Sequence, residues 1–247
     1  MSAPFDRVPR DHAGKTLETY IVSVDLAQAA DFTAISVLKR TYPTPFEVPT
    51  YDLGHLERWQ QVPYTQIGRV VRDRVAALRA AWPQPLVTVI YDRTGVGAAA
   101  GDVMEESAID APLIAVTIHG GDQVSGDAYR GFRVPKRDLV SATAVVMQAR
   151  RLRIAKQLAL APVLAEELGN FKMTFSKTTG HDSYEAWREG IHDDCVLSVA
   201  MALWHWEYED AQFRGKDATS YSYLTSDDDE DELGPDAWFA RHGRNQR

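Results

Sequence analysis

The chain has 247 residues, enough for one large domain or one domain with tails, and its 45% hydrophobic and 25% charged residues are ordinary globular values. No segment approaches the roughly 20 apolar residues that cross a bilayer, and the first residues lack the apolar core of a signal peptide. The single cysteine, Cys195, excludes an intramolecular disulfide and a cysteine-based zinc cage, and it favours a reducing interior.

The net charge of −8 at first disfavours a nucleic-acid partner. However, seven acidic residues lie between Asp227 and Asp236, and without this run the rest of the chain is nearly neutral. Basic residues cluster in 129–137 and 149–156. Net charge therefore neither supports nor excludes binding to nucleic acid.

The first part of the chain predicts three strands after an irregular lead-in over residues 1–16. The segments 18–27, 32–42 and 46–59 are rich in β-branched and aromatic residues, and Pro49 suggests an edge or irregular position in the third. The short connections between them indicate an antiparallel meander.

Helices and strands then alternate. Apolar residues at helical spacing predict a helix over 64–82, and a continuous apolar run predicts a strand over 85–92 that is buried on both faces. A short helix over 96–107, a fifth strand over 112–119 and a helix over 136–150 follow. Right-handed crossovers would place the fourth strand beside the first, in the centre of the sheet.

This order predicts an α/β, ribonuclease-H-like fold. Its mixed sheet has five or more strands, of which the first three are antiparallel, with helices on both faces. A short strand at 152–155, a helix at 161–168 and a small hairpin excursion within 171–187 would complete it. We expect the folded domain to span 17–212 and an acidic, disordered tail to span 213–247.

Four aspartates stand where this fold would bring them together. Asp25 and Asp92 end the two strands expected at the sheet centre, and Asp193 and Asp194 begin an apolar helix. Each has an alternative role, since strand-end aspartates cap turns and an acidic pair stabilises the start of a helix. Clustered like charges repel one another unless a cation lies between them, which points to Mg²⁺ or Mn²⁺ bound by carboxylate oxygens.

Two such ions could activate a water molecule and stabilise the leaving oxygen in phosphodiester cleavage. Asp31 could reach the second ion, although a solvated turn is its more ordinary role. The chain has no Walker A sequence, so we expect no ATP site.

Three segments, IVSVDLAQAADFTAISVL, VTVIYDRTGVGAAAGDVM and GIHDDCVLSVAMALW, resemble the successive motifs of the nuclease domain of bacteriophage large terminase subunits. FRVPKRDLVSA and RLRIA are also similar to that family, and the resemblance covers residues 18–206. It implies a metal-dependent endonuclease that cuts double-stranded DNA with little sequence specificity as viral genomes are packaged.

Carried over residue by residue, the resemblance assigns the strand-end ligands to Asp25 and Asp92. The third ligand is Asp193 or Asp194, with Asp194 favoured because successive helical residues point about 100° apart. Asp31 resembles an accessory acid, and His192 orients or caps its neighbours. Large terminases normally also carry a packaging ATPase, which this chain lacks, so it is either an excised nuclease domain or a nuclease encoded apart from its motor.

Partners follow from the same resemblance and from the charge map. Double-stranded DNA is the expected substrate, and the packaging ATPase, portal and small terminase are the expected protein partners, in the cytoplasm of an infected bacterium and without a membrane. Basic residues near the expected site predict contacts to the DNA backbone, although each could equally be a solvated surface charge: Arg130, Arg133, Lys136, Arg137, Lys172 and Lys177.

Other functions also fit the sequence. A Holliday-junction resolvase-like nuclease would use the same carboxylates on branched DNA. A catalytically idle module that docks a motor onto a portal would fit the missing ATPase, but it would not need an acidic cluster. An actin-like ATPase shares the sheet topology but requires phosphate loops that this chain lacks.

Overall fold

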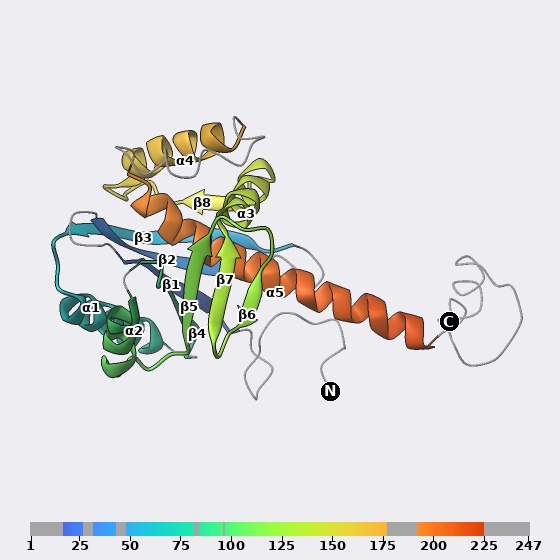
Figure 1. The fold of residues 1–247 in the computed structure, drawn as a ribbon, viewed down its shortest axis with the longest axis horizontal. Helices are drawn as coiled ribbons and strands as arrows, with labels where there is room; N and C mark the ends of the chain where they lie inside the picture. Colours follow the sequence, from blue (N-terminus) through green and yellow to red (C-terminus); the bar gives the residue numbers. More distant parts are fainter. Residues whose placement is uncertain are drawn as a thin grey trace, which may run out of the picture. The chain divides into compact units, whose positions relative to one another are not determined.

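The computed structural model describes residues 17–26, 32–42, 48–81, 84–95, 97–176 and 192–224. The chain divides into two compact units, Met1–Glu207 and Tyr208–Arg247. The first unit holds the sheet and the residues discussed below (Figure 1). None of the described helices is long and apolar enough to cross a membrane.

One mixed sheet of eight strands forms the centre of the first unit, in the order β6-β7-β5-β4-β1-β2-β3-β8. The strands β1, β2 and β3 form an antiparallel meander, β4 is parallel to β1, and β5 is parallel to β4. This arrangement confirms the predicted ribonuclease-H-like fold. The bounds are β1 (Thr19–Asp25), β2 (Phe32–Thr41), β3 (Thr50–Gln60), β4 (Leu86–Asp92), β5 (Leu113–His119), β6 (Ser125–Asp127), β7 (Gly131–Pro135) and β8 (Leu152–Ile154).

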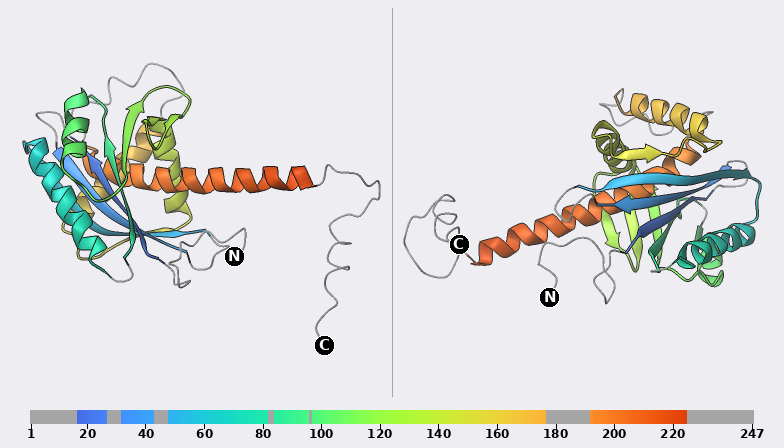
Figure 2. Two further views of the ribbon diagram at one scale, coloured as in Figure 1. Left: turned by 90° about the horizontal axis from the view of Figure 1, so that it is seen from below. Right: turned by 180° about the vertical axis from the view of Figure 1, so that it is seen from behind.

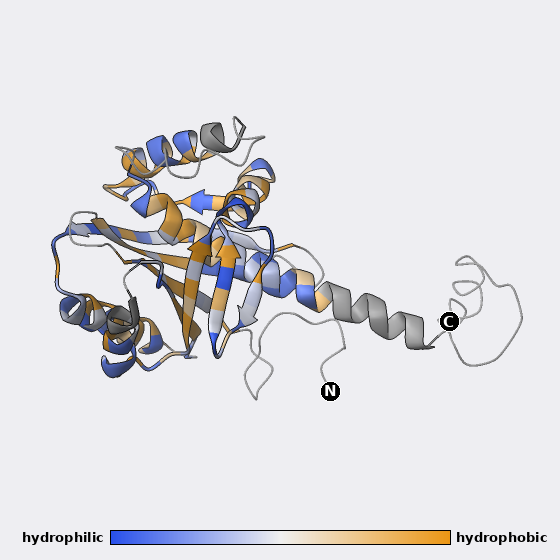
Figure 3. Cartoon of the chain, in the orientation of Figure 1, coloured by the Kyte–Doolittle hydropathy of each residue, from blue (hydrophilic) through white to orange (hydrophobic). Residues whose placement is uncertain are grey.

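The central strands are buried on both faces, as their continuous apolar sequence predicts. In β1, Ile21, Val22 and Val24 have no exposed surface, although adjacent residues point to opposite faces of the sheet. The strands in the centre of Figure 3 are correspondingly coloured as hydrophobic. Hydrophobic burial on both faces fixes the register of β1 and β4, because a slip of one residue would move every side chain to the other face.

Five helices cover the sheet (Figures 1 and 2). They are α1 (Tyr64–Arg79), α2 (Gly97–Glu106), α3 (Lys136–Gln148), α4 (Ala161–Ser176) and α5 (Asp194–Leu224). The buried stripe of α1, formed by Ile67, Val71 and Val75, packs in one core cluster with Val22 and Val24 of β1. This face of the sheet therefore carries α1, and Met104 of α2 belongs to the same cluster.

The opposite face is covered by the first turns of α5. Every residue from Cys195 to Trp206 is buried, which is typical of a helix that is apolar on all sides. Trp204 packs edge-on against Phe132 of β7, and Trp206 stacks on Tyr51 of β3, with ring centroids 5.4 Å apart in both pairs. Because these contacts lie on β7 and β3, the helix crosses several strands of the sheet.

Some predicted elements differ from the structure. The strands β6 and β7 were not predicted, because Gly126 and Gly131 and the short length of each strand resemble a loop. The predicted hairpin over 171–187 is wrong in its first part, since α4 continues through Ser176, and its remaining residues lie outside the described part of the chain. The predicted tail over 213–247 begins within α5, which is helical to Leu224, and residues 225–247 also lie outside the described residues.

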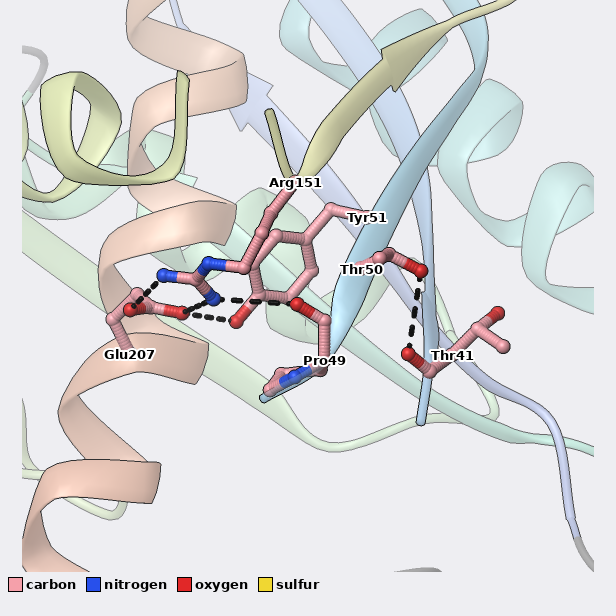
Figure 4. A network of polar contacts seen from close by, with 6 residues as sticks. All are labelled: Thr41, Pro49, Thr50, Tyr51, Arg151 and Glu207. Atoms are coloured by element: carbon pink, nitrogen blue, oxygen red, sulfur yellow. Dashed lines mark hydrogen bonds and ion pairs between the residues drawn. The ribbon is translucent and has the colours of Figure 1, made fainter. Parts of the chain in front are cut away.

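A buried ion pair fixes α5 at the end of the first unit (Figure 4). Arg151, which precedes β8, donates from Nη1 and Nη2 to the two carboxylate oxygens of Glu207, at 2.7 Å each. The Tyr51 hydroxyl also donates to Glu207, and Arg151 Nη1 lies 3.3 Å from the carbonyl oxygen of Pro49. This bidentate geometry gives the pair both energy and a fixed orientation.

Replacing Glu207 with glutamine should lower the free energy of unfolding by about 1–3 kcal/mol, because the buried Arg151 loses its charged partner. Urea unfolding followed by circular dichroism measures this change. An unfolding midpoint equal to that of the wild type would show that the pair does not hold α5 in place.

Candidate metal and nuclease site

Two buried aspartates lie side by side at the carboxyl ends of the central strands. The parallel register of β1 and β4 pairs Val24 with Tyr91, so Asp25 and Asp92 follow as neighbours. Residues paired in this way point to the same face of a sheet. Both aspartates are only 7% exposed. The adjacency expected from the sequence is therefore present, and it follows from the parallel pairing of β1 with β4.

The loop after β4 holds Asp92 in place. Asp92 Oδ1 accepts a hydrogen bond from the backbone N–H of Thr94 at 2.6 Å, and Thr94 Oγ1 accepts one from the backbone N–H of Ile118 at 2.6 Å. The loop is therefore hydrogen-bonded both to the Asp92 carboxylate and to β5. Its sharp turn uses Gly95, which has a φ of 73°.

The start of α5 brings a second pair of carboxylates to this edge. The carbonyl oxygen of Asp193 accepts the hydrogen bond from the N–H of Leu197 at 2.8 Å, so Asp193 occupies the N-cap position and Asp194 is the first helical residue. The Asp194 side chain is buried, with 7% exposed, and the charges of both aspartates act on Asp25. Asp193 and Asp194 therefore begin α5 and also lie close enough to Asp25 to act on its charge.

Lys136, the first residue of α3, supplies a positive charge within this cluster. Its Nζ lies 3.1 Å from Asp193 Oδ2, and its side chain is 16% exposed. Burial lowers the pKa of Lys136, while the charges of Asp193, Asp25 and Asp92 oppose this change. The Lys136 side chain thus points toward the carboxylates, and its expected contact to DNA stays a prediction.

The electrostatics of the cluster disfavour full ionisation. Burial, together with the charges of Asp92, Asp193 and Asp194, raises the pKa of Asp25 well above its usual range, and Lys136 opposes this. Burial also raises the pKa of Asp92 to about 6, against the lowering effect of the hydrogen bonds from Thr94. A second positive charge in this cluster would be strongly favourable.

These side chains suit a divalent metal by their chemistry. Buried carboxylates are the oxygen ligands that Mg²⁺ and Mn²⁺ prefer, and they repel one another until a cation is bound. As placed here, however, no three His, Cys, Asp or Glu side chains among the described residues converge closely enough to hold an ion. Metal binding at Asp25, Asp92 and Asp194 would therefore require their side chains to turn toward a common point.

A buried acid that the sequence analysis missed, Glu167 of α4, lies beside this cluster. It is 5% exposed, and burial, together with the charges of Asp194 and Asp193, raises its pKa to about 7. The sequence did hold a signal, since Glu167 falls on the stripe of α4 that Leu164 and Leu168 define. A charged residue on an apolar stripe indicates a buried partner.

The remaining predicted site residues are more dispersed. His192 is half exposed, its Nδ1 lies 3.7 Å from Asp194 Oδ2, and its ring packs edge-on against Phe32. This fits the predicted role of a local orienting group. Asp31 and Lys177 lie outside the described residues, as does the side chain of Lys172.

The predicted DNA-contacting arginines do not form one compact cluster. Arg130 is exposed in the turn before β7, and Arg133 is exposed within that strand. Lys136 comes directly after β7, so Arg130 and Lys136 lie at opposite ends of the strand. Arg137 forms an ion pair with Asp122. Arg130 and Arg133 thus remain the most accessible of the described members of the set.

No protein-family model and no curated protein matches the chain. Among solved structures, the large terminase nuclease of thermophilic phage G20c is similar, with 17% identity, coverage of 74% of this chain and 80% of that chain, and a TM-score of 0.45. The manganese-soaked terminase nuclease domain of human cytomegalovirus shows 13% identity, coverage of 80% and 90%, and a TM-score of 0.46. RuvC of Thermus thermophilus shows 13% identity, coverage of 78% and 97%, and a TM-score of 0.39.

The raised pKa of Asp92 predicts a pH-dependent stability in metal-free buffer. The folded protein holds this proton up to about pH 6, whereas the unfolded chain releases it near 3.8, so ionisation of Asp92 destabilises the fold as the pH rises through this window. Relative to wild type, Asp92→Asn should gain about 2–3 kcal/mol of unfolding free energy between pH 4 and pH 7. Urea titrations at both pH values, with Asp102→Asn on exposed α2 as the surface control, measure this gain; a constant difference would contradict it.

Proposed function

We propose that this chain is a divalent-metal-dependent endonuclease that hydrolyses phosphodiester bonds in double-stranded DNA. The observation that carries this proposal is the cluster of Asp25, Asp92, Asp193 and Asp194 where two central strands end and a buried helix begins. Four mutually repelling carboxylates are costly for a purely structural role. Their charge is useful in a protein that binds cations.

In this mechanism Asp25, Asp92 and Asp194 hold the metal, and Asp193 supports it. One or two Mg²⁺ or Mn²⁺ ions would supply activation of a water molecule and stabilisation of charge at the scissile phosphate. Asp25 and Asp92 are themselves buried, which limits the access of bulk water to their carboxylates. Lys136 lies beside Asp193 and stabilises negative charge at this edge of the sheet.

Backbone contacts to the DNA fall to exposed cations outside the carboxylate cluster. Arg130 and Arg133 are exposed near the edge of the sheet and are suited to phosphate contacts, which carry no sequence information. Weak sequence preference is therefore expected.

The cellular role that we propose is the nuclease part of a viral DNA-packaging terminase, with packaging ATPase, portal and small terminase as partners. The motif resemblance supports this role. The resemblance in sequence to the nuclease domain of bacteriophage large terminase subunits extends through the three segments that contain Asp25, Asp92 and Asp194.

Plasmid cleavage tests the proposed activity. Wild-type protein should nick and linearise supercoiled plasmid with Mg²⁺ or Mn²⁺ and lose this activity in EDTA. Asp25→Ala and Asp92→Ala should each reduce the rate by about a hundredfold or more, because metal stabilisation of the transition state is worth several kcal/mol.

Asp102→Asn serves as the matched control, since its carboxylate lies on the exposed face of α2. Linear duplex and four-way junction substrates should be compared in the same assay. Faster cutting of the junction would favour a resolvase, and an intact plasmid with both metals would contradict autonomous nuclease activity.

Lys136 and Arg130 should have separable roles in DNA binding. Arg130→Ala should weaken duplex binding and reduce the slope of log affinity against log salt by about 1, because one phosphate contact is lost. Lys136→Met should leave this slope unchanged, since its ammonium faces Asp193. Fluorescence anisotropy of labelled duplex in EDTA measures the affinity of each variant and its dependence on salt. An equal change of slope in the two variants would place Lys136 at the DNA backbone.

A further inference from the structure

The first turn of α5 is capped by a side chain from another helix. Glu167 Oε2 of α4 accepts a hydrogen bond from the backbone N–H of Val196 at 2.8 Å, and both groups are buried. Val196 is the third residue of α5, and a helix leaves the N–H of this position without a partner of its own. An N-cap side chain commonly accepts this bond, whereas here Asp193, at the N-cap position, directs Oδ2 to Lys136.

Glu167 is itself anchored to the sheet. Arg58 of β3 places Nη1 3.3 Å from Glu167 Oε1, so the two carboxylate oxygens have separate partners. The side chains of Arg58 and Glu167 are 18% and 5% exposed. A partly buried ion pair of this kind fixes an orientation more than it adds stability.

A further chain of contacts reaches the other side of the aspartate pair. The Arg58 guanidinium lies over the Phe32 ring, 4.2 Å from its centroid, and the Phe32 ring packs edge-on against His192 with centroids 5.0 Å apart. His192 immediately precedes Asp193. Phe32 of β2 and Glu167 of α4 therefore contact the residues on either side of Asp193 and Asp194, and Arg58 of β3 contacts both Phe32 and Glu167.

We propose that Glu167, anchored by Arg58, is the positioning residue that holds Asp193 and Asp194 in place for metal binding. This inference rests on the proposed function. Glu167 acts through the backbone of α5, because its oxygens face Val196 N–H and Arg58, and it is not itself a metal ligand. Asp25 and Asp92 are positioned differently, by the paired strands that they end and, for Asp92, by the N–H of Thr94.

Three variants of the full chain test the role. Glu167→Ala removes the cap and the ion pair, Glu167→Gln keeps an oxygen for the Val196 N–H but loses the charge, and Glu207→Gln breaks the matched ion pair further along the same helix. The readouts are Mn²⁺ affinity by electron paramagnetic resonance, hydrogen exchange over 192–198, and plasmid cleavage as a function of Mn²⁺.

Glu167→Ala should weaken Mn²⁺ binding by about tenfold to a hundredfold, which is the usual effect of losing a group that orients a ligand. Exchange over 192–198 should become faster, and saturating Mn²⁺ should restore much of the cleavage rate. Glu167→Gln should fall between this variant and the wild type, and Glu207→Gln should leave Mn²⁺ affinity unchanged.

Three results would overturn the proposal. A specific positioning role is excluded if both Glu167 variants show wild-type Mn²⁺ affinity and wild-type hydrogen exchange. It is also excluded if Glu167→Ala and Glu207→Gln show equal losses of Mn²⁺ affinity. A loss of Mn²⁺ binding in Glu167→Gln as complete as that of Asp92→Asn would make Glu167 a ligand. If Glu167→Ala does not fold, Glu167→Gln and Arg58→Gln carry the comparison, and each should raise the Mn²⁺ dissociation constant.

Failure of the proposed function gives a different pattern. If the wild type neither binds Mn²⁺ nor cuts DNA, the nuclease assignment fails. Hydrogen exchange then still decides the positioning role, since faster exchange over 192–198 in Glu167→Ala supports it and unchanged exchange overturns it.

Discussion

The site depends on one constraint, the parallel pairing of β1 with β4. This pairing places Asp25 and Asp92 next to each other on the same face of a buried sheet. Two carboxylates held this way repel in a medium of low dielectric constant, so positive charge and hydrogen-bond donors must be nearby. Lys136 and the N–H of Thr94 meet this requirement from two different segments.

The burial of α5 explains why its first turn can carry Asp193 and Asp194 beside the other two carboxylates. A helix that is apolar on all sides from Cys195 to Trp206 is held by packing against the sheet, and it does not depend on its own N-cap for stability. The N-cap residue Asp193 is therefore available to the site, while Glu167 accepts the N–H of Val196. Further along the helix, Glu207 forms an ion pair with Arg151.

Much of this arrangement could be predicted from the sequence. The strands ending in Asp25 and Asp92 have continuous apolar runs, and chain order with right-handed crossovers places them side by side. The short strands β6 and β7 were missed because each contains a glycine and they are only three and five residues long; β7 is a strand because it pairs with β5, and β6 because it pairs with β7. The inward orientation of Lys136 could not be predicted, because a basic cluster in a sequence does not reveal which member faces the carboxylates. Glu167 required knowledge of which face of α4 is buried, which tertiary packing decides.

The position of Lys136 also bears on how such a protein can evolve. Its ammonium supplies internal charge compensation for Asp193, Asp25 and Asp92, so folding need not wait for a metal ion as it does in a zinc finger. Because this compensation comes from the chain itself, a lineage that lost one of these aspartates would keep its fold. The architecture is therefore well suited to serve as a scaffold, in which the sheet and α5 persist whether or not the proposed activity is retained.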